Sequence, residues 1–141
     1  MKKLLTLFIL ISSIANANLK DGKYTCTSDK TIWFWYPYTE MTVENGEVVS
    51  ASHDRIKKDG RKASLDEGYN KSMLKKNGVN PEIYSKVIPE NYFKAEKDLE
   101  KMDGLAGATD SVKHFKKQMS LLLEKAETVG PGDYIIEKSQ L

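Results

Sequence analysis

Apolar and polar residues alternate along the first part of the chain that follows residue 17. Residues 22–28 (GKYTCTS) alternate and are rich in β-forming side chains, which predicts a strand. Residues 38–44 and 47–52 alternate in the same way and are separated by Asn45-Gly46. Asn-Gly readily adopts the positive φ angles of a type I′ turn, so these two segments are predicted to form a β-hairpin.

Three-and-four spacing of apolar residues then predicts helices. Residues 65–78 are predicted to be helical, with Ser64 or Asp66 as N-cap and Gly78 as C-cap. The apolar face expected for this helix comprises Leu65, Tyr69, Met73 and Leu74. Residues 80–102 are predicted to be helical but broken at Pro89, with an apolar stripe of Ile83, Val87 and Ile88.

The clearest amphipathic pattern lies near the C-terminus. Its apolar positions are Val112, Phe115, Met119, Leu122, Leu123 and Ala126. Gly130-Pro131-Gly132 ends this helix, and residues 133–137 (DYIIE) are predicted to form a last short strand. Strands followed by helices predict an α+β fold, with a small antiparallel or mixed sheet packed against helices.

Residues 31–38 (TIWFWYPY) are the most aromatic stretch. If this stretch is extended, Trp33 and Trp35 share one face and Phe34 and Tyr36 share the other. Packing in the core is the favoured interpretation, because aromatic side chains dominate core energetics. The alternative is a wall that stacks on a bound aromatic cofactor, or an exposed docking patch for a partner protein.

Residues 1–17 change the interpretation of the composition. A basic start, an apolar run from Leu4 to Ile11 and the ending Ala15-Asn16-Ala17 predict a cleaved signal peptide, which leaves a mature domain of residues 18–141. An uncleaved anchor is the alternative. No cysteine follows the apolar run, so no lipid anchor is predicted there, and no later run predicts a transmembrane segment. The protein is therefore expected in the periplasm or outside the cell.

Charge and cysteine content narrow the function further. Of 22 Lys and Arg residues, two leave with the signal peptide, so 20 remain against 20 Asp and Glu. This balance argues against a nucleic-acid-binding protein. The single cysteine, Cys26, cannot form an internal disulfide and is interpreted as a partly buried strand residue. The two histidines, His53 and His114, have no metal-ligand spacing, so no metal site is predicted.

A glycine-rich turn, residues 103–108, stands directly before the last helix. The N-terminus of a helix presents unpaired N–H groups and partial positive charge, so Thr109 would present its hydroxyl at an anion site. The alternative is that Thr109, Asp110 or Ser111 only caps the helix.

Residues 103–109 (DGLAGAT) resemble the flavinylation motif of the FMN-binding domain family, Asp-Gly-x-(Ser/Thr)-Gly-Ala-(Thr/Ser). Residues 21–28, the hairpin region 42–60 and residues 64–73 also resemble segments of that family, the last of them a helix of its small lipoprotein branch. The resemblance covers roughly residues 20 to 127. Two residues depart from it: Ala106 stands where Ser or Thr is usual, and Cys26 where glycine is common.

The resemblance implies that a flavin transferase joins the phosphate of FMN to Thr109 through a phosphoester. It implies an FMN-binding domain with the flavin at the N-terminus of the last long helix. The FMN-binding residues implied are Asp103, Gly104, Leu105, Ala106, Gly107, Ala108 and Ser111. It further suggests flavin contacts from Tyr69, Met73 and His114, although Tyr69 and Met73 could equally face the core and His114 could be a surface residue.

Function follows from this resemblance as an expectation. An exported protein with covalent FMN would carry electrons between membrane or extracytoplasmic redox proteins, and would be an electron carrier rather than a stand-alone enzyme. The alternatives are a non-flavinylated binding or interaction module of the same fold, and a flavin-dependent reductase component.

Overall fold

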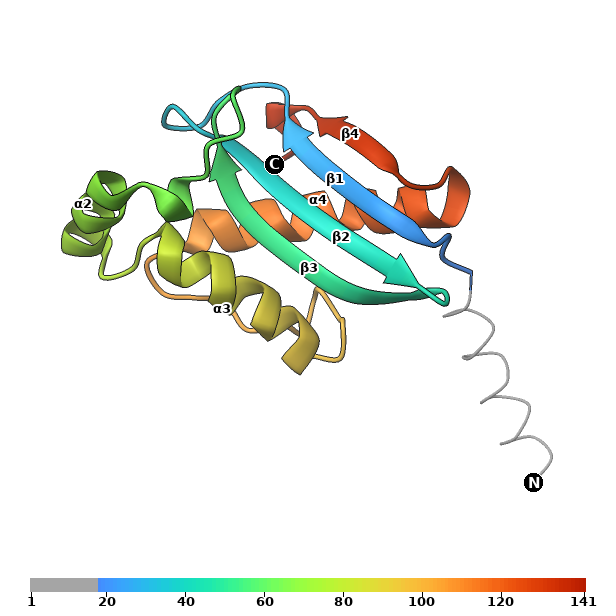
Figure 1. The fold of residues 1–141 in the computed structure, drawn as a ribbon. Coiled ribbons are helices and arrows are strands. Elements are labelled where there is room, and N and C mark those ends of the chain that lie inside the picture. The colour runs from blue at the N-terminus through green and yellow to red at the C-terminus, as the bar shows by residue number, and fades with distance from the viewer. Residues whose placement is uncertain (1–17) are drawn as a thin grey trace, which may run out of the picture.

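The computed structural model describes residues 18–141, which form a four-stranded sheet. Figure 1 shows that the helices pack against one face of this sheet. The strands are β1 (Gly22–Ser28), β2 (Tyr36–Glu44), β3 (Glu47–Ile56) and β4 (Gly132–Ile136), in the spatial order β3-β2-β1-β4. The helices are α2 (Glu67–Asn77), α3 (Pro81–Lys94) and α4 (Thr109–Thr128), with short 3-10 turns η1 (Ala63–Leu65) and η2 (Lys138–Gln140). The predicted α+β class, with a mixed sheet packed against helices, is confirmed.

The sheet combines local and distant pairings. β1 pairs with β2 and β2 with β3 in antiparallel fashion, whereas β4 returns from α4 to lie parallel to β1. The predicted Asn45-Gly46 turn is present, with φ of 53° and 76°. The carboxylate of Asp21 accepts hydrogen bonds from both N–H groups of this turn, at 3.0 and 2.9 Å. The hairpin strands extend further than predicted, starting at Tyr36 and ending at Ile56.

The alternation of side chains along each strand determines which residues lie on the buried face of the sheet. Tyr24 and Cys26 of β1 and Met41 and Val43 of β2 are buried beneath the helices, as strand periodicity requires. The opposite face is polar and partly open, with Lys23 ion-paired to Glu40 at 3.4 Å. Burial raises the pKa of the Cys26 thiol to about 12, which agrees with its interpretation as a structural residue.

Helix α4 crosses behind β1 and β2 and supplies much of the core (Figure 1). Of its predicted apolar positions, all but Leu123 are buried, and Leu123 is half-buried. Buried Gln118 lies on the same helix: its amide donates to the carbonyls of Cys26 and Pro37, and its Oε1 accepts from Thr39 at 2.7 Å. A polar side chain is tolerated there because its hydrogen bonds are satisfied.

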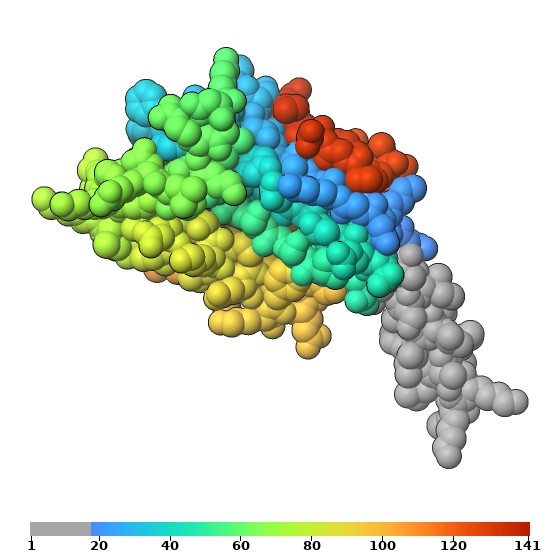
Figure 2. Space-filling view, viewed as in Figure 1, coloured from blue at the N-terminus to red at the C-terminus, as the bar shows by residue number. Residues whose placement is uncertain are grey.

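Helices α2 and α3 begin and end near the predicted residues but bury different faces. Asp66 and Asn80 cap them, and Gly78 ends α2 with φ of 73°. The apolar face predicted for α2 is wrong in part: Leu65 is 80 % exposed and Leu74 is exposed as well. Only Asn70 of α2 is buried, because α2 projects beyond the end of the sheet, as Figure 2 shows.

The predicted break at Pro89 is also wrong. Helix α3 continues through Pro89 to Lys94. Proline's fixed φ fits a helix, and the single hydrogen bond that it removes is outweighed by burial of the residues around it. These buried residues are Tyr84, Ile88 and Tyr92, so the stripe is shifted from the predicted one, and Ile83 is exposed.

The predicted signal peptide lies outside the described residues. Among residues 18–141, no helix combines the length and apolar character needed to cross a membrane.

Candidate functional site

Helix α4 begins at Thr109 without a side-chain cap. Ala108 occupies the N-cap position, and within the described residues no side chain caps the backbone N–H groups of the first turn. The capping alternative for Thr109, Asp110 and Ser111 is therefore wrong. The first N–H groups of α4 have no helical acceptor because of their position. Thr109 and Asp110 are exposed beside them, whereas Ser111 is buried.

The turn before α4 depends on Gly107. Its φ is 86°, and a Cβ added there would lie 2.5 Å from the backbone oxygen of Asn77 and 2.8 Å from Cγ1 of Val79. Only glycine combines this φ with so close an approach. Gly107 thus holds Ala108 and Thr109 against the end of α2.

A cavity of about 670 Å³ opens at this point, within the size range of small-molecule sites. One wall is the start of α4 and its preceding turn, another is α2, and the rim is the segment before β2. Its lining residues are Trp33, Phe34, Arg55, Tyr69, Met73, Lys76, Asn77, Tyr84, Gly107, Ala108, Thr109, Asp110 and Ser111. Trp33 and Phe34 precede β2 and Arg55 lies near the end of β3, so the cavity is at the end of the sheet where β2 starts and β3 ends.

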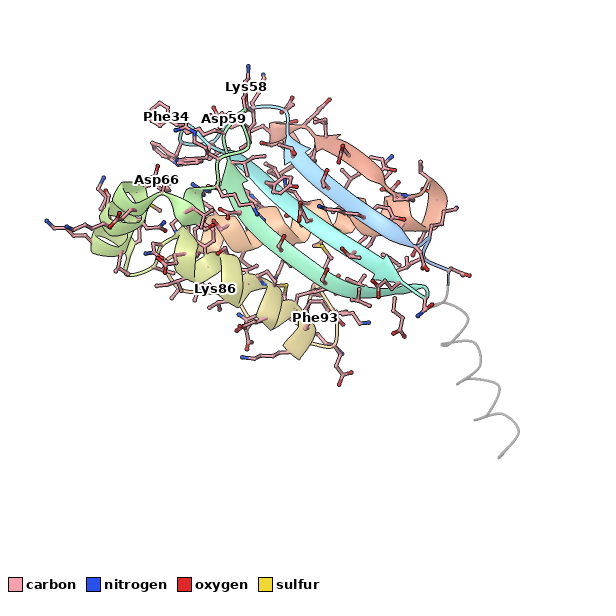
Figure 3. All side chains as sticks on the ribbon, in the orientation of Figure 1. Phe34, Lys58, Asp59, Asp66, Lys86 and Phe93 are labelled. Carbon is pink, nitrogen blue, oxygen red and sulfur yellow. The ribbon has the colours of Figure 1, made fainter. Side chains whose placement is uncertain are left out.

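Two aromatic residues form a strained turn on the rim. Backbone bonds between Ile32 and Trp35, at 2.7 and 3.2 Å, close a two-residue turn with Trp33 and Phe34 at its centre. Their φ angles are 52° and 74°, the pattern of a type I′ turn. Asn and Gly suit these positions, whereas bulky side chains are rare outliers there. Both side chains are also exposed, at 75 % and 79 %, and Figure 3 shows Phe34 projecting from the fold.

The predicted extended conformation of this stretch is therefore wrong at Trp33 and Phe34. Core packing is correct only for Trp35, which is buried. Trp35 lies 5.3 Å from the Tyr69 ring, and the ammonium of Lys57 sits 4.3 Å from the Trp35 ring centre. The Lys57 ammonium also donates to the carbonyl of Phe34 at 2.9 Å, which fixes the aromatic turn to β3.

Half-buried Tyr69 and Met73 line the α2 wall. The predicted flavin contacts Tyr69 and Met73 thus lie in one cavity with Thr109. Asn77 donates to the Met73 sulfur at 3.6 Å, which orders that side chain. Of the predicted motif residues, Gly107, Ala108 and Ser111 also line this cavity.

The remaining motif residues lie elsewhere. Gly104, Leu105 and Ala106 line a neighbouring cavity of about 570 Å³, which Thr109 also borders. Its other lining residues are Val112, Lys113, Lys116 and Lys117, so lysines of α4 surround it. Asp103 is exposed and lines neither cavity; its carbonyl accepts a 3.3 Å hydrogen bond from Asn91.

His114 is buried beneath the cavity and does not line it, so its interpretation as a surface residue is wrong. Burial first, and then the Arg55 charge, lower the pKa of His114 to about 4. His53 is also buried, and burial, with smaller contributions from His114 and Arg55, lowers its pKa to about 3. Both imidazoles are therefore neutral at pH 7.

Hydrogen bonds fix the tautomer of His53. The Thr39 hydroxyl donates its only proton to Gln118, so it accepts from Nδ1–H of His53 at 2.8 Å. The Nε2 atom of His53 is left with a bare lone pair and no partner. Three other buried polar atoms of the described residues share this lack of a partner: Nε of Arg55, the hydroxyl of Tyr84 and Nδ1 of His114.

Sequence reasoning missed Arg55 and Tyr84. Arg55 follows His53 and Asp54 in a polar run that ends the alternating pattern of the hairpin, and this break in alternation was the available signal. Tyr84 was indistinguishable in the sequence from any apolar helix residue.

No family model matches the chain. The chain is 27% identical over 135 residues to the 15 kDa lipoprotein of Treponema pallidum (strain Nichols), a similarity that covers 95% of this chain and 94% of that protein. The crystal structure of the CPE2226 protein from Clostridium perfringens has the same fold, with a TM-score of 0.76 and 23% identity. The alignment covers 84% of this chain and 98% of the Clostridium chain.

Proposed function

We propose that this protein is an exported flavoprotein domain that carries FMN as a phosphoester on Thr109 and transfers electrons outside the cytoplasmic membrane. One observation carries the proposal. The exposed Thr109 hydroxyl, at an uncapped helix N-terminus, borders the same cavity as Trp33, Phe34, Tyr69 and Met73. An acceptor hydroxyl and a set of aromatic or polarisable side chains are the two things that a tethered aromatic cofactor requires.

The start of α4 suits a phosphoester. Thr109 Oγ1 would form the new bond to phosphorus, the bond from phosphorus to the leaving group of the flavin donor would break, and the hydroxyl proton would be lost. The free N–H groups of the first helical turn and the helix dipole stabilise the resulting negative charge. Gly107 keeps the backbone before α4 close to Asn77, and the Thr109 side chain is exposed to solvent.

The rim and the α2 wall suit a flavin ring. Trp33 and Phe34 offer exposed faces, and half-buried Tyr69 and Met73 offer a second surface across the cavity. Bound FMN supplies one- and two-electron redox chemistry, so the protein itself needs to hold and shield the ring and to set its potential. An open rim leaves an edge of the ring accessible to redox partners.

Export is supported by two features. Residues 1–17 have the pattern of a signal peptide. The Treponema relative is named a lipoprotein, and lipoproteins are exported, membrane-associated proteins. A covalent link prevents loss of the flavin by dilution in such a compartment. A flavin transferase and membrane or extracytoplasmic redox proteins are accordingly the proposed partners.

The intact mass of mature protein, expressed with a flavin transferase, tests this proposal. We expect the wild-type chain to gain the mass of FMN less one water, and Thr109→Ala to gain nothing. Thr128→Ala is the matched control, because Thr128 is an exposed threonine at the opposite end of the same helix. An unmodified mass in wild type and control alike would refute the covalent carrier.

A non-flavinylated binding module is the second candidate. It is favoured by Ala106, which replaces a hydroxyl residue of the motif, and by the exposure of Trp33 and Phe34, which would suit a protein partner equally. Absence of flavin absorbance from protein purified from its own host would favour this candidate.

A further inference from the structure

Arg55 is a buried cation without an anionic partner. It lies near the end of β3, is only 6 % exposed and lines the Thr109 cavity. The chain has one other arginine, Arg61, which is exposed and forms a 2.9 Å ion pair with Asp59. Arginines that are buried normally pair with carboxylates or phosphates, because a buried unpaired charge is strongly unfavourable.

The groups around Arg55 do not neutralise it. Within residues 18–141, no carboxylate lies within 4.0 Å of its guanidinium. The adjacent Asp54 carboxylate is occupied by Ser64, from both its N–H and its hydroxyl, and by the backbone N–H of Arg55. Among residues 18–141 the guanidinium has two hydrogen-bond partners, the hydroxyls of Tyr69 and Ser111, both at 3.5 Å and so longer than ordinary hydrogen bonds.

The other groups at the floor do not pair with Arg55 either. Tyr84 is buried and has a pKa raised to about 12 chiefly by burial, so it is neutral. His53 and His114 are neutral as well, and the Arg55 charge helps to lower the pKa of each. Asp110 is the one carboxylate that lines the cavity, and it is exposed in the first turn of α4, where it offsets the helix dipole. Arg55 and Lys76 line the cavity beside this one carboxylate, so the lining has more cations than carboxylates. Within the described residues the Nε of Arg55 has no acceptor.

Two independent features thus face the same space: the buried guanidinium of Arg55 and the uncapped start of α4. Ser111 connects them, since it belongs to the first turn of α4 and contacts Arg55. A planar guanidinium and backbone N–H groups together suit a tetrahedral oxyanion, which accepts several charge-assisted hydrogen bonds.

We infer that Arg55 binds a phosphate group at the base of this cavity. The anion site itself follows from Arg55 and α4; its assignment to the phosphate of FMN rests on the proposed function. In that assignment Arg55 neutralises the phosphodiester on Thr109 from below, while the ring extends toward Trp33 and Phe34.

The test uses the unmodified mature chain and inorganic phosphate as the probe. Thermal unfolding is followed while phosphate replaces chloride at constant ionic strength, in wild type, Arg55→Gln, Arg55→Lys and the matched control Arg61→Gln. We expect phosphate to raise the Tm of wild type and Arg61→Gln equally. The apparent affinity should be at least about tenfold weaker in Arg55→Gln. Arg55→Lys should retain part of the affinity for phosphate, because lysine keeps the charge but not the planar set of donors.

Each chain is compared with itself with and without phosphate, so a change in basal stability does not affect the result. If Arg55→Gln fails to fold, Arg55→Lys carries the comparison. An absent Tm response in wild type, or an equal response in wild type and every folded Arg55 variant, would overturn the anion site. The mass measurement on Thr109 is a separate test. FMN attachment without a Tm response to phosphate would refute the Arg55 anion site alone. A Tm response to phosphate without FMN attachment would refute the flavin proposal alone.

Discussion

Replacing Gly107 by alanine perturbs the turn that sets the position of Thr109. Gly107 has φ of 86°, so an L-residue there costs about 1–2 kcal/mol. The new Cβ would also lie 2.5 Å from the Asn77 carbonyl oxygen and 2.8 Å from Val79, too close for either to remain in place. We therefore expect Gly107→Ala to lower the free energy of unfolding by at least about 2 kcal/mol.

Urea unfolding and thermal unfolding measure this loss. For a domain of this size, about 2 kcal/mol corresponds to a Tm decrease of about 6–10 °C. Gly104→Ala is the matched control in the same turn, because nothing lies within 4 Å of its added Cβ and its φ is not positive. Its expected effect is neutral to slightly stabilising, by up to about 1 kcal/mol, through a less flexible unfolded chain. Equal effects of the two variants would refute the close-packed turn.

Three further predictions concern stability. Replacing the strained turn by Trp33→Asn with Phe34→Gly should raise the free energy of unfolding, measured in urea, by about 1–3 kcal/mol. A loss of stability would contradict the strain. The pKa values of His53 and His114 are lowered to about 3 and about 4, so unfolding takes up protons as pH falls. The free energy of unfolding should therefore decline below about pH 6.5, by up to about 1.4 kcal/mol per pH unit for each histidine, until the pH nears the lowered pKa values. Urea unfolding at pH 7.5 and 5.5 measures this slope, and His114→Gln should reduce it by about half. Gln118→Leu leaves buried backbone carbonyls unpaired and should cost about 2–4 kcal/mol; a change below about 0.5 kcal/mol would exclude that role.

The sequence predicted those elements whose signals are local. Residues 22–28, the Asn45-Gly46 hairpin and α4 were predictable because alternation, turn chemistry and helical spacing agree there. The capping residues Asp66 and Gly78 could likewise be predicted from the sequence. None of these patterns indicates, however, which face of α2 has a partner, and Leu65 and Leu74 are exposed because α2 lies beyond the sheet.

The site was predictable only where a motif carries it. Thr109, Tyr69 and Met73 were expected near one another from the resemblance, and they do line one cavity. The aromatic turn could not be foreseen, because Trp and Phe are poor residues for positive φ and their intrinsic preference is extended. Arg55 could not be foreseen either, since its lack of a partner is a property of the folded neighbourhood.

Unfavourable features concentrate at one end of this molecule. The aromatic turn at positive φ and the unpaired Arg55 each destabilise the folded chain, and α4 begins there without a side-chain cap. Elsewhere the hairpin turn has the usual Asn-Gly sequence, and the other positive φ angles outside glycine are those of Glu96 and Lys97, 56° and 63°, after α3. Strain and unsatisfied charge persist in proteins where function requires them.

A single type of ligand would account for all three features. A phosphate would neutralise Arg55 and accept hydrogen bonds from the start of α4. An aromatic ring joined to that phosphate would cover the exposed faces of Trp33 and Phe34. A ligand without an anionic group leaves the Arg55 charge unexplained, and one without a ring leaves the aromatic turn unexplained. We therefore propose a ligand that joins an anionic group to an aromatic ring, as FMN does, and both requirements come from Arg55, α4 and the aromatic turn rather than from the motif at residues 103–109.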